Sequence, residues 1–207
     1  MKMNRCFGDK KRGTGIRKRK PVIFLSLEGN NKTEKQYFKS LNRSNGEKYS
    51  LQFTSGHETD INNMWEALID ITQNSMNPAD GDMAFCVCDR DHETYKINRI
   101  RAVKSKAKSS KLHLVVSNPC FEIWFLNHFK YSTREYSSYN ELREELCQYI
   151  PCYEKNINCF NFLEDKTLVA IENSVKQIEQ VTGNNLTEVN IIGNPGTEIY
   201  KIVKVLI

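Results

Sequence analysis

The chain has 207 residues, and its 30 Lys and Arg residues against 25 Asp and Glu residues give a formal net charge of +5. A hydrophobic content of 39% and an aromatic content of 10% exclude a disordered chain, and the length suits one α/β domain with a sizeable core. No segment has the roughly 20 consecutive apolar residues of a membrane span, and the basic N-terminus lacks the apolar region of a signal peptide.

The basic residues are concentrated at the N-terminus. Residues 1–20 hold nine basic residues and one acid, a net charge of +8, and the rest of the chain has a net charge of −3. Because this first segment has almost no apolar content, we expect a flexible arm without a core of its own. Its charge suits salt-dependent contact with the phosphates of DNA or RNA. The arm residues predicted to bind nucleic acid are Arg17, Lys18, Arg19 and Lys20.

Strand-sized apolar segments alternate with amphipathic helical segments through residues 21–130. The predicted strands, each a short apolar or alternating run, are residues 22–27, 49–54, 83–88 and 112–116. The predicted helices are residues 34–41 with Thr33 as N-cap, 61–72 with Thr59 and Asp60 as caps, 93–109, and 119–129 beginning at Pro119. This order predicts an α/β fold with a parallel sheet of about four strands and helices on both faces.

The pattern becomes polar and helical beyond Lys130. The elements predicted there are helices at residues 139–149 and 163–181, a strand at residues 189–192, and a last helix from Thr197 after Asn194-Pro195. We therefore divide the chain into the arm of residues 1–20, an α/β core of residues 21–130, and a helical C-terminal extension of residues 131–207 that packs on the core.

Acidic side chains follow three of the predicted strands where each strand ends. Glu28 follows the first strand, Asp89 and Asp91 follow the third, and Glu122 lies one turn beyond the fourth. Ligands of an open parallel sheet bind at the carboxyl ends of its strands, where the strand order reverses. Clustered carboxylates repel one another unless a cation lies between them, and such oxygen ligands suit Mg²⁺ or Mn²⁺. The pattern therefore predicts a divalent-metal site that is able to hydrolyse a phosphate ester.

Simpler interpretations of these residues stay open. Acids routinely end strands, Glu28 alone is typical of a loop carboxylate, and Glu122 in a first helical turn favours the helix dipole. The seven cysteines, without a secretory signal, indicate reduced thiols and a cytoplasmic protein. Three of them, Cys147, Cys152 and Cys159, are a weak zinc-site alternative, since there is no CxxC pair and no nearby histidine.

A second basic segment lies between residues 96 and 111, with seven basic residues and no acid. It begins just after Asp91, so its first turn flanks the predicted metal site. The residues that we expect to contact nucleic acid are Lys96, Arg99 and Lys104. The alternative is an ordinary solvated helix face.

Several of these motifs together resemble the RloB-like family of bacterial phage-defence proteins. The matching residues are Leu27-Glu28-Gly29 with Lys32-Thr33-Glu34, Asp89-Arg90-Asp91, Ser117 to Trp124 with His128-Phe129, and Asn194 to Thr197. The resemblance covers about residues 17–207, and the Ser117 to Glu122 segment is its most specific part. The sequence departs from the family at Asn30-Asn31, so we assign no role to Glu34.

The resemblance implies a toprim-like fold and a metal-dependent nuclease. In that role Glu28 is a metal ligand or general acid/base, Asp89 and Asp91 are Mg²⁺ ligands, and Glu122 is a further acidic site residue. It also implies a partner, an ABC-type AAA ATPase encoded alongside.

We therefore expect a Mg²⁺- or Mn²⁺-dependent nuclease in phage defence that acts on DNA or on RNA such as tRNA. One alternative is a non-catalytic adaptor with a basic arm, which binds nucleic acid or docks on an ATPase and whose acidic residues are structural. A phosphotransfer or nucleotide-binding enzyme is disfavoured, because no phosphate-binding glycine loop is present. The sequence leaves the substrate and a homo-oligomeric state open.

Overall fold

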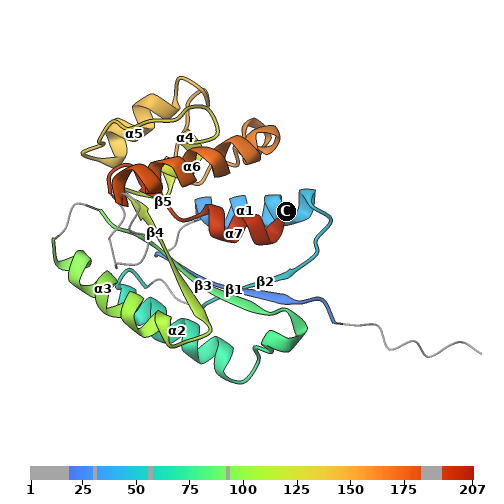
Figure 1. Ribbon diagram of the computed structural model, residues 1–207. Coiled ribbons are helices and arrows are strands. Elements are labelled where there is room, and N and C mark those ends of the chain that lie inside the picture. Colours follow the sequence, from blue (N-terminus) through green and yellow to red (C-terminus); the bar gives the residue numbers. More distant parts are fainter. Residues whose placement is uncertain (1–18, 30–31, 56–57, 92–93, 183–192) are drawn as a thin grey trace, which may run out of the picture.

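A computed structural model describes residues 19–29, 32–55, 58–91, 94–182 and 193–207. Most of the predicted arm, with Arg17 and Lys18, lies outside these residues, as does the strand predicted at residues 189–192. In the described part a central sheet is covered by helices on both faces (Figure 1). No helix in these ranges combines the length and apolar character needed to cross a membrane.

The sheet has five strands in the order β2-β1-β3-β4-β5. They are β1 (Val22–Leu27), β2 (Ser50–Phe53), β3 (Met83–Asp89), β4 (Leu112–Asn118) and β5 (Gly196–Thr197). The first four are mutually parallel, and β5 pairs antiparallel with β4. The strand order reverses at β1, because the chain first adds β2 on one side and then β3 on the other. The predicted α/β class is confirmed as a Rossmann-like arrangement, with an additional antiparallel edge strand.

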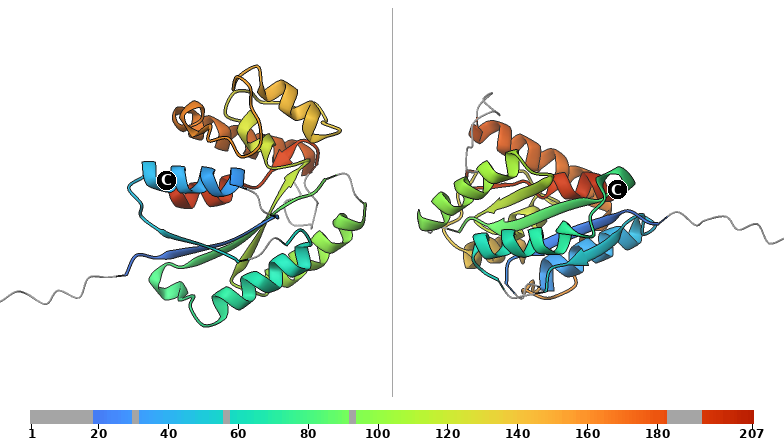
Figure 2. Two further views of the ribbon diagram at one scale, coloured as in Figure 1. Left: turned by 180° about the vertical axis from the view of Figure 1, so that it is seen from behind. Right: turned by 90° about the horizontal axis from the view of Figure 1, so that it is seen from below.

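Two helices cover one face of the sheet and the others lie on the opposite side (Figures 1 and 2). The helices are α1 (Lys32–Ser44), α2 (Ile61–Gln73), α3 (Thr94–Lys108), α4 (Glu122–Leu126), α5 (Tyr139–Leu146), α6 (Thr167–Thr182) and α7 (Tyr200–Leu206). Short 3-10 turns are η1 (Pro78–Asp80), η2 (Phe160–Phe162) and η3 (Glu164–Lys166). Helices α2 and α3 cover one face, and α1 and α7 pack on the other, with α4, α5 and α6 beyond them.

Burial on both faces explains why the strands are continuous apolar runs. In β1, Ile23 and Leu25 pack into the cluster that includes residues of α1 and α4 to α7. Phe24, between them, packs into the second cluster with α2 and α3. Successive side chains of a strand point to opposite faces, so both hydrophobic cores are built from the same strands.

The C-terminal part of the chain completes the sheet and one of the cores. In α7, Ile202, Val203 and Leu206 are fully buried in the cluster that contains Ile23. The preceding β5 pairs with Ser117 and Asn118 of β4. Residues 131–207 are therefore not only the helical extension that the sequence predicts, because they also provide an edge strand.

The prediction that Asn118-Pro119 and Asn194-Pro195 start helices is wrong. Both of these peptide bonds are cis, and α4 begins only at Glu122 while α7 begins at Tyr200. After the first pair, the carbonyl of Pro119 accepts a hydrogen bond from Asp91 N at 3.0 Å. After the second pair, residues 196–197 join the sheet as β5. Contacts with distant segments therefore decide the backbone at both places.

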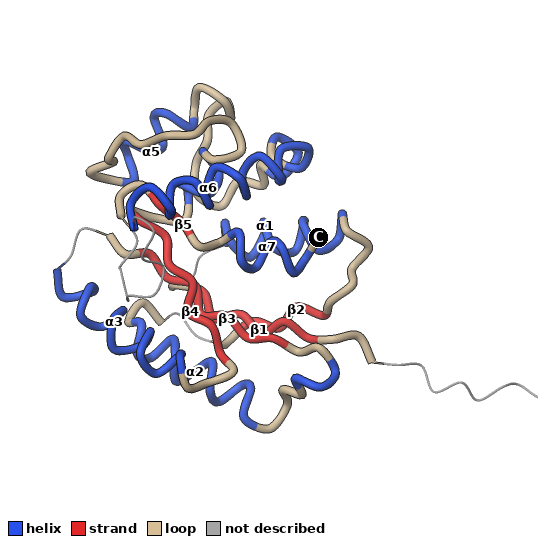
Figure 3. The backbone as a smooth tube through the Cα atoms, in the orientation of Figure 1, coloured by secondary structure: helices blue, strands red, loops and turns tan. Residues whose placement is uncertain are grey.

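Other predicted boundaries shift for similar reasons. Helix α1 begins at Lys32, so Thr33 lies in its first turn, and its hydroxyl accepts a hydrogen bond from Asn156 N at 2.9 Å. Asp60 is confirmed as the N-cap of α2, because its carboxylate accepts from Asn62 N at 2.9 Å. Between α5 and α6 the chain runs mostly as loop and 3-10 turns, so this region is less helical than predicted (Figure 3).

Candidate active site

Glu28 and Asp89 meet at the carboxyl ends of β1 and β3, which are neighbours in the sheet. Glu28 follows β1 directly, and its Oε2 accepts a hydrogen bond from the backbone N of Asp89 at 2.9 Å. Asp89 is the last residue of β3 and is buried. Gly29, with φ +62°, turns the chain away from β1 and donates its N–H to Glu58 O at 2.7 Å. Adjacent strand ends thus deliver two carboxylates to one place, as the sequence predicts.

Asp91 reaches the same place through an unusual backbone conformation. Its φ is +48°, in the left-handed region that Asp tolerates better than most residues. Two hydrogen bonds dock the segment on the chain after β4, from Arg90 N to Ser117 O at 2.8 Å and from Asp91 N to Pro119 O at 3.0 Å. The Asp-x-Asp segment is therefore fixed by the neighbouring strand end.

Lys96 of α3 bridges two of these carboxylates. Its Nζ lies 2.7 Å from Glu28 Oε1, 2.5 Å from Asp91 Oδ2 and 3.5 Å from the backbone O of Asp89. The Lys96 side chain is only 13% exposed. Burial opposes its charge, but hydrogen bonds to Asp91 and Glu28 outweigh that effect and raise the pKa of Lys96. An ammonium group thus holds the position between strand ends where the sequence predicts a cation.

Two further glutamates lie buried beside Asp89. Glu34 of α1 is 2% exposed and Glu122 of α4 is 1% exposed. Burial, together with the negative charges of Glu28, Glu34, Glu122 and Asp91, raises the pKa of Asp89 well above its usual range. Burial, and the charges of Glu122 and Glu28, also raise the pKa of Glu34 to about 8. These acids share one electrostatic environment, and their mutual repulsion disfavours ionising all of them.

The loop after α5 closes this acidic cluster from the other side. Tyr153 is fully buried and donates its hydroxyl to Glu122 Oε1 at 3.3 Å, and Lys155 Nζ lies 4.0 Å from the same oxygen. Although burial lowers it, the charges of Glu122 and Asp89 raise the pKa of Lys155 overall. The other oxygen, Glu122 Oε2, is buried and has no hydrogen-bond partner in the described part of the chain.

The donor chemistry of the cluster fits a divalent cation, but the side chains are not assembled as a metal site. Within the described ranges, no three His, Cys, Asp or Glu side chains are placed to hold one ion. Carboxylate oxygens are the ligands that Mg²⁺ and Mn²⁺ prefer, and the buried Oε2 of Glu122 lacks a partner there. The Lys96 ammonium already pairs with Glu28 and Asp91, so an ion that binds the same two oxygens must displace it.

The described cysteines give no support to a zinc site. Cys147 is half-buried, Cys152 is exposed and Cys159 is buried, and all described cysteines are free thiols. None of them belongs to a metal-binding group within the described residues.

The described arm residues lie at the opposite end of β1, before the strand begins. Arg19 forms ion pairs with Asp82 at 2.8 Å and Asp80 at 3.2 Å, and Asp82 accepts a hydrogen bond from Val22 N at the start of β1. Lys20 is exposed at the same end of β1. A six-residue strand is about 20 Å long, so β1 separates these residues from Glu28.

The predicted nucleic-acid contacts of α3 are largely engaged within the protein. Besides Lys96, Arg99 pairs with Asp60, and Lys104 lies 3.5 Å from Glu198 with its side chain 17% exposed. Lys104 therefore helps to hold α3 to the C-terminal segment. Of the three, Arg99 is the most accessible, with a side chain that is 47% exposed.

Sequence reasoning missed three residues of the cluster. Glu34 belongs to the motif that resembles the family, so a signal for it was present in the Lys32-Thr33-Glu34 run. Tyr153 and Lys155 come from a region without a recognisable motif, more than 60 residues from Asp89 in the chain. Only tertiary packing brings them to Glu122.

The comparisons with known proteins agree with this arrangement of motifs. No curated protein sequence and no solved structure is significantly similar to the chain. A family model described as RloB-like protein matches residues 23–206, which contain all the strands and helices described above except Val22, the first residue of β1. The chain therefore belongs to the RloB-like family.

Proposed function

We propose that this protein is a divalent-metal-dependent nuclease that hydrolyses phosphodiester bonds in bacterial phage defence. The observation that carries the proposal is the crowding of four other carboxylates around Asp89, from the end of β1, α1, the loop after β3, and α4. Such crowding costs free energy unless a cation is near, and the cluster lies at the carboxyl ends of parallel strands, where ligands bind. The toprim-like resemblance of the motifs supports the same activity.

Glu28, Asp89 and Asp91 are the residues that would hold Mg²⁺ or Mn²⁺. A bound ion of this kind lowers the pKa of a water nucleophile and offsets negative charge on the phosphate. The Asp89 N–H orients Glu28 through its hydrogen bond to Oε2. Lys155, 41% exposed beside Glu122, offers a positive charge to the substrate phosphate. Once displaced from the carboxylates, Lys96 would offer a second positive charge to the phosphate.

The test is cleavage of plasmid DNA, single-stranded DNA and tRNA by the purified chain, with and without Mg²⁺ or Mn²⁺. We expect metal-dependent cleavage of at least one substrate, and a loss of at least about 100-fold in Asp89→Asn, which keeps the shape but removes the charge. Asp70→Asn is the matched control, because Asp70 is exposed on α2. Equal activity of the Asp89→Asn and Asp70→Asn variants would overturn the proposal.

The second candidate function is a non-catalytic adaptor that binds nucleic acid or an ATPase. It is favoured by the Lys96 ammonium, which already pairs with both Glu28 and Asp91 without a metal. This function predicts binding of DNA or RNA that is lost at high salt or on deletion of residues 1–20, without metal-dependent cleavage. An ABC-type AAA ATPase is the partner that family resemblance suggests, and co-purification with the neighbouring gene product tests it.

A further inference from the structure

A polar cavity of about 740 Å³ opens beside the acidic cluster. It is lined by Arg90, Asp91, Asn118, Glu135, Tyr136, Ser137, Glu141, Gly193 and Asn194. One wall is thus the Asp-x-Asp segment itself, and the opposite wall is the loop that leads into α5. Its volume lies within the range of roughly 300–1,000 Å³ that is typical of small-molecule sites.

The charges of the cavity suit a neutral polar group better than a phosphate. Asp91 is paired with Lys96, and Glu141 is paired with Arg134. Arg90 and Glu135 are the remaining charged residues of the lining, and they are of opposite sign. Because no net positive charge results, a phosphate gains little here. A sugar and base have the polar edges that such a lining recognises.

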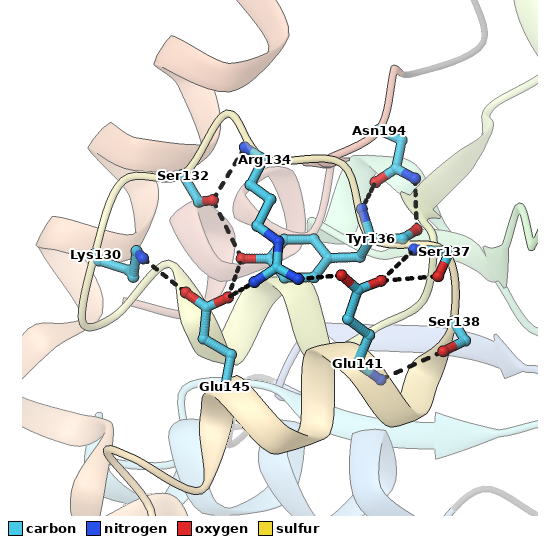
Figure 4. A network of polar contacts seen from close by, with 9 residues as sticks. All are labelled: Lys130, Ser132, Arg134, Tyr136, Ser137, Ser138, Glu141, Glu145 and Asn194. Carbon is cyan, nitrogen blue, oxygen red and sulfur yellow. Dashed lines mark hydrogen bonds and ion pairs between the residues drawn. The ribbon is translucent and has the colours of Figure 1, made fainter.

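The loop wall of the cavity is held rigidly (Figure 4). The Asn194 side chain accepts from Tyr136 N at 3.1 Å and donates to Tyr136 O at 2.7 Å, which fixes the loop backbone. The Tyr136 hydroxyl donates to Glu145 at 2.8 Å, and Lys130 holds the other oxygen of Glu145 at 2.6 Å. Ser137 N donates to Glu141 at 2.8 Å. A wall fixed in advance loses little conformational freedom when a ligand binds.

Glu135 is the cavity carboxylate that this network leaves available. It is exposed, and it makes no hydrogen bond or ion pair within the described part of the chain. A carboxylate has two acceptor oxygens side by side and no donor. Its best partner among nucleobases is the edge of guanine that carries two adjacent N–H donors. Uracil and thymine present one N–H donor between two carbonyl oxygens. These two oxygens repel the oxygens of a carboxylate.

We propose that this cavity binds the nucleoside adjacent to the scissile phosphate, and that Glu135 selects guanine over uracil or thymine. The inference rests on the proposed function, because that function places the scissile phosphate at the acidic cluster. Asp91 borders both places, so a phosphate at the cluster directs the next sugar and base into the cavity. The cavity is therefore a nucleoside subsite, and Glu135 is its specificity-determining residue.

The experiment is a ligand-observed NMR titration of the full chain with guanosine, adenosine, cytidine and uridine, without added metal. We expect guanosine to bind most tightly and uridine at least about tenfold more weakly. In Glu135→Gln the affinity for guanosine falls about tenfold, because one acceptor becomes a donor, and the preference over uridine disappears. Glu144→Gln is the matched control, since Glu144 is exposed on α5 outside the cavity lining.

Three outcomes overturn the inference: equal binding of all four nucleosides, no nucleoside binding, or a Glu135→Gln variant that behaves like Glu144→Gln. Equal melting temperatures of the two variants exclude a folding defect as the cause. The result is independent of the cleavage assay. If guanosine binds selectively but no nucleic acid is cut, the proposed nuclease fails and the nucleoside subsite stands. If wild-type and Glu135→Gln proteins cut alike with the same base preference, only the subsite fails.

Discussion

At the scale of single residues, Lys96 controls the charge of the candidate site. Its ammonium contacts Glu28 and Asp91 and lies 3.5 Å from the carbonyl of Asp89, so it links the ends of β1 and β3 to α3. A divalent ion that binds the same oxygens competes with this ammonium group, because like charges repel at short distance. Lys96 and a metal are therefore competitors for the carboxylates.

Replacing Lys96 is expected to strengthen metal binding. In Lys96→Met the ammonium is lost and the aliphatic volume is kept, so the affinity of the chain for Mn²⁺ rises about tenfold or more, the effect of about 1.4 kcal/mol. Isothermal titration calorimetry or the electron paramagnetic resonance signal of free Mn²⁺ measures this without any substrate. Lys106→Met is the control, because Lys106 is 55% exposed on the same helix and pairs with Glu66. Unchanged or weaker Mn²⁺ binding in Lys96→Met would contradict the competition.

At the scale of elements, the short helix α4 is anchored by polar contacts in a buried setting. His128, two residues beyond α4, is 1% exposed and its Nδ1 bonds the carbonyl of Trp124 at 2.9 Å. Asn127 donates to Ser174 and Gln177 of α6, both at 2.8 Å. These bonds satisfy polar groups in the interior and fix α4, which carries Glu122, against α6.

The buried histidine predicts a loss of stability in mild acid. Burial lowers the pKa of His128 to about 4, against an ordinary value of 6.5. The unfolded chain therefore takes up a proton below pH 6.5 that the folded chain binds only near pH 4, and stability falls over this window. Between pH 7.5 and 5, the free energy of unfolding of the wild type is expected to fall by roughly 2 kcal/mol more than that of His128→Gln.

Urea denaturation at the two pH values checks this prediction. The control is His113→Gln, because His113 is an exposed residue of β4 and its substitution removes a smaller part of the pH dependence. A pH dependence that is the same in wild type and His128→Gln would show that folding does not lower the pKa of His128.

At the scale of the whole molecule, one hydrophobic core joins the start and the end of the chain. Ile23 of β1, Phe38 of α1 and Leu206 of α7 belong to the same buried cluster. Helix α7 lies beside α1 on this face of the sheet (Figure 1). The last segment is therefore needed for the stability of the sheet whose strand ends carry the candidate site.

A cavity in α7 is expected to destabilise the entire protein. Leu206 is 0% exposed, so Leu206→Ala should lower the free energy of unfolding by about 2–5 kcal/mol. Leu168→Ala makes the same chemical change on α6, where the side chain is 67% exposed, and should cost no more than about 0.5 kcal/mol. Thermal and urea unfolding of both variants measure the difference. Equal stability of the two variants would mean that α7 is not part of the cooperative core.

Local patterns were sufficient for much of the fold. The apolar runs at β1, β3 and β4 identify buried strands, and Asp60 identifies the start of α2, because these signals involve residues close in the chain. Asn118-Pro119 and Asn194-Pro195 were misinterpreted, since their backbone depends on β4, β5 and the Asp-x-Asp segment. The short β5 has no signal of its own, because two residues form a strand only against a partner.

The sequence by itself determined that this is an α/β chain of the RloB-like kind with Glu28, Asp89 and Asp91 at strand ends, because strand periodicity and parallel topology place them at one edge. Only the tertiary structure decided which groups surround them. It brings Glu34, Glu122 and Lys155 to Asp89 and places the Lys96 ammonium between Glu28 and Asp91. Electrostatic energies depend on distance in space rather than on separation along the chain, so no local pattern contains them.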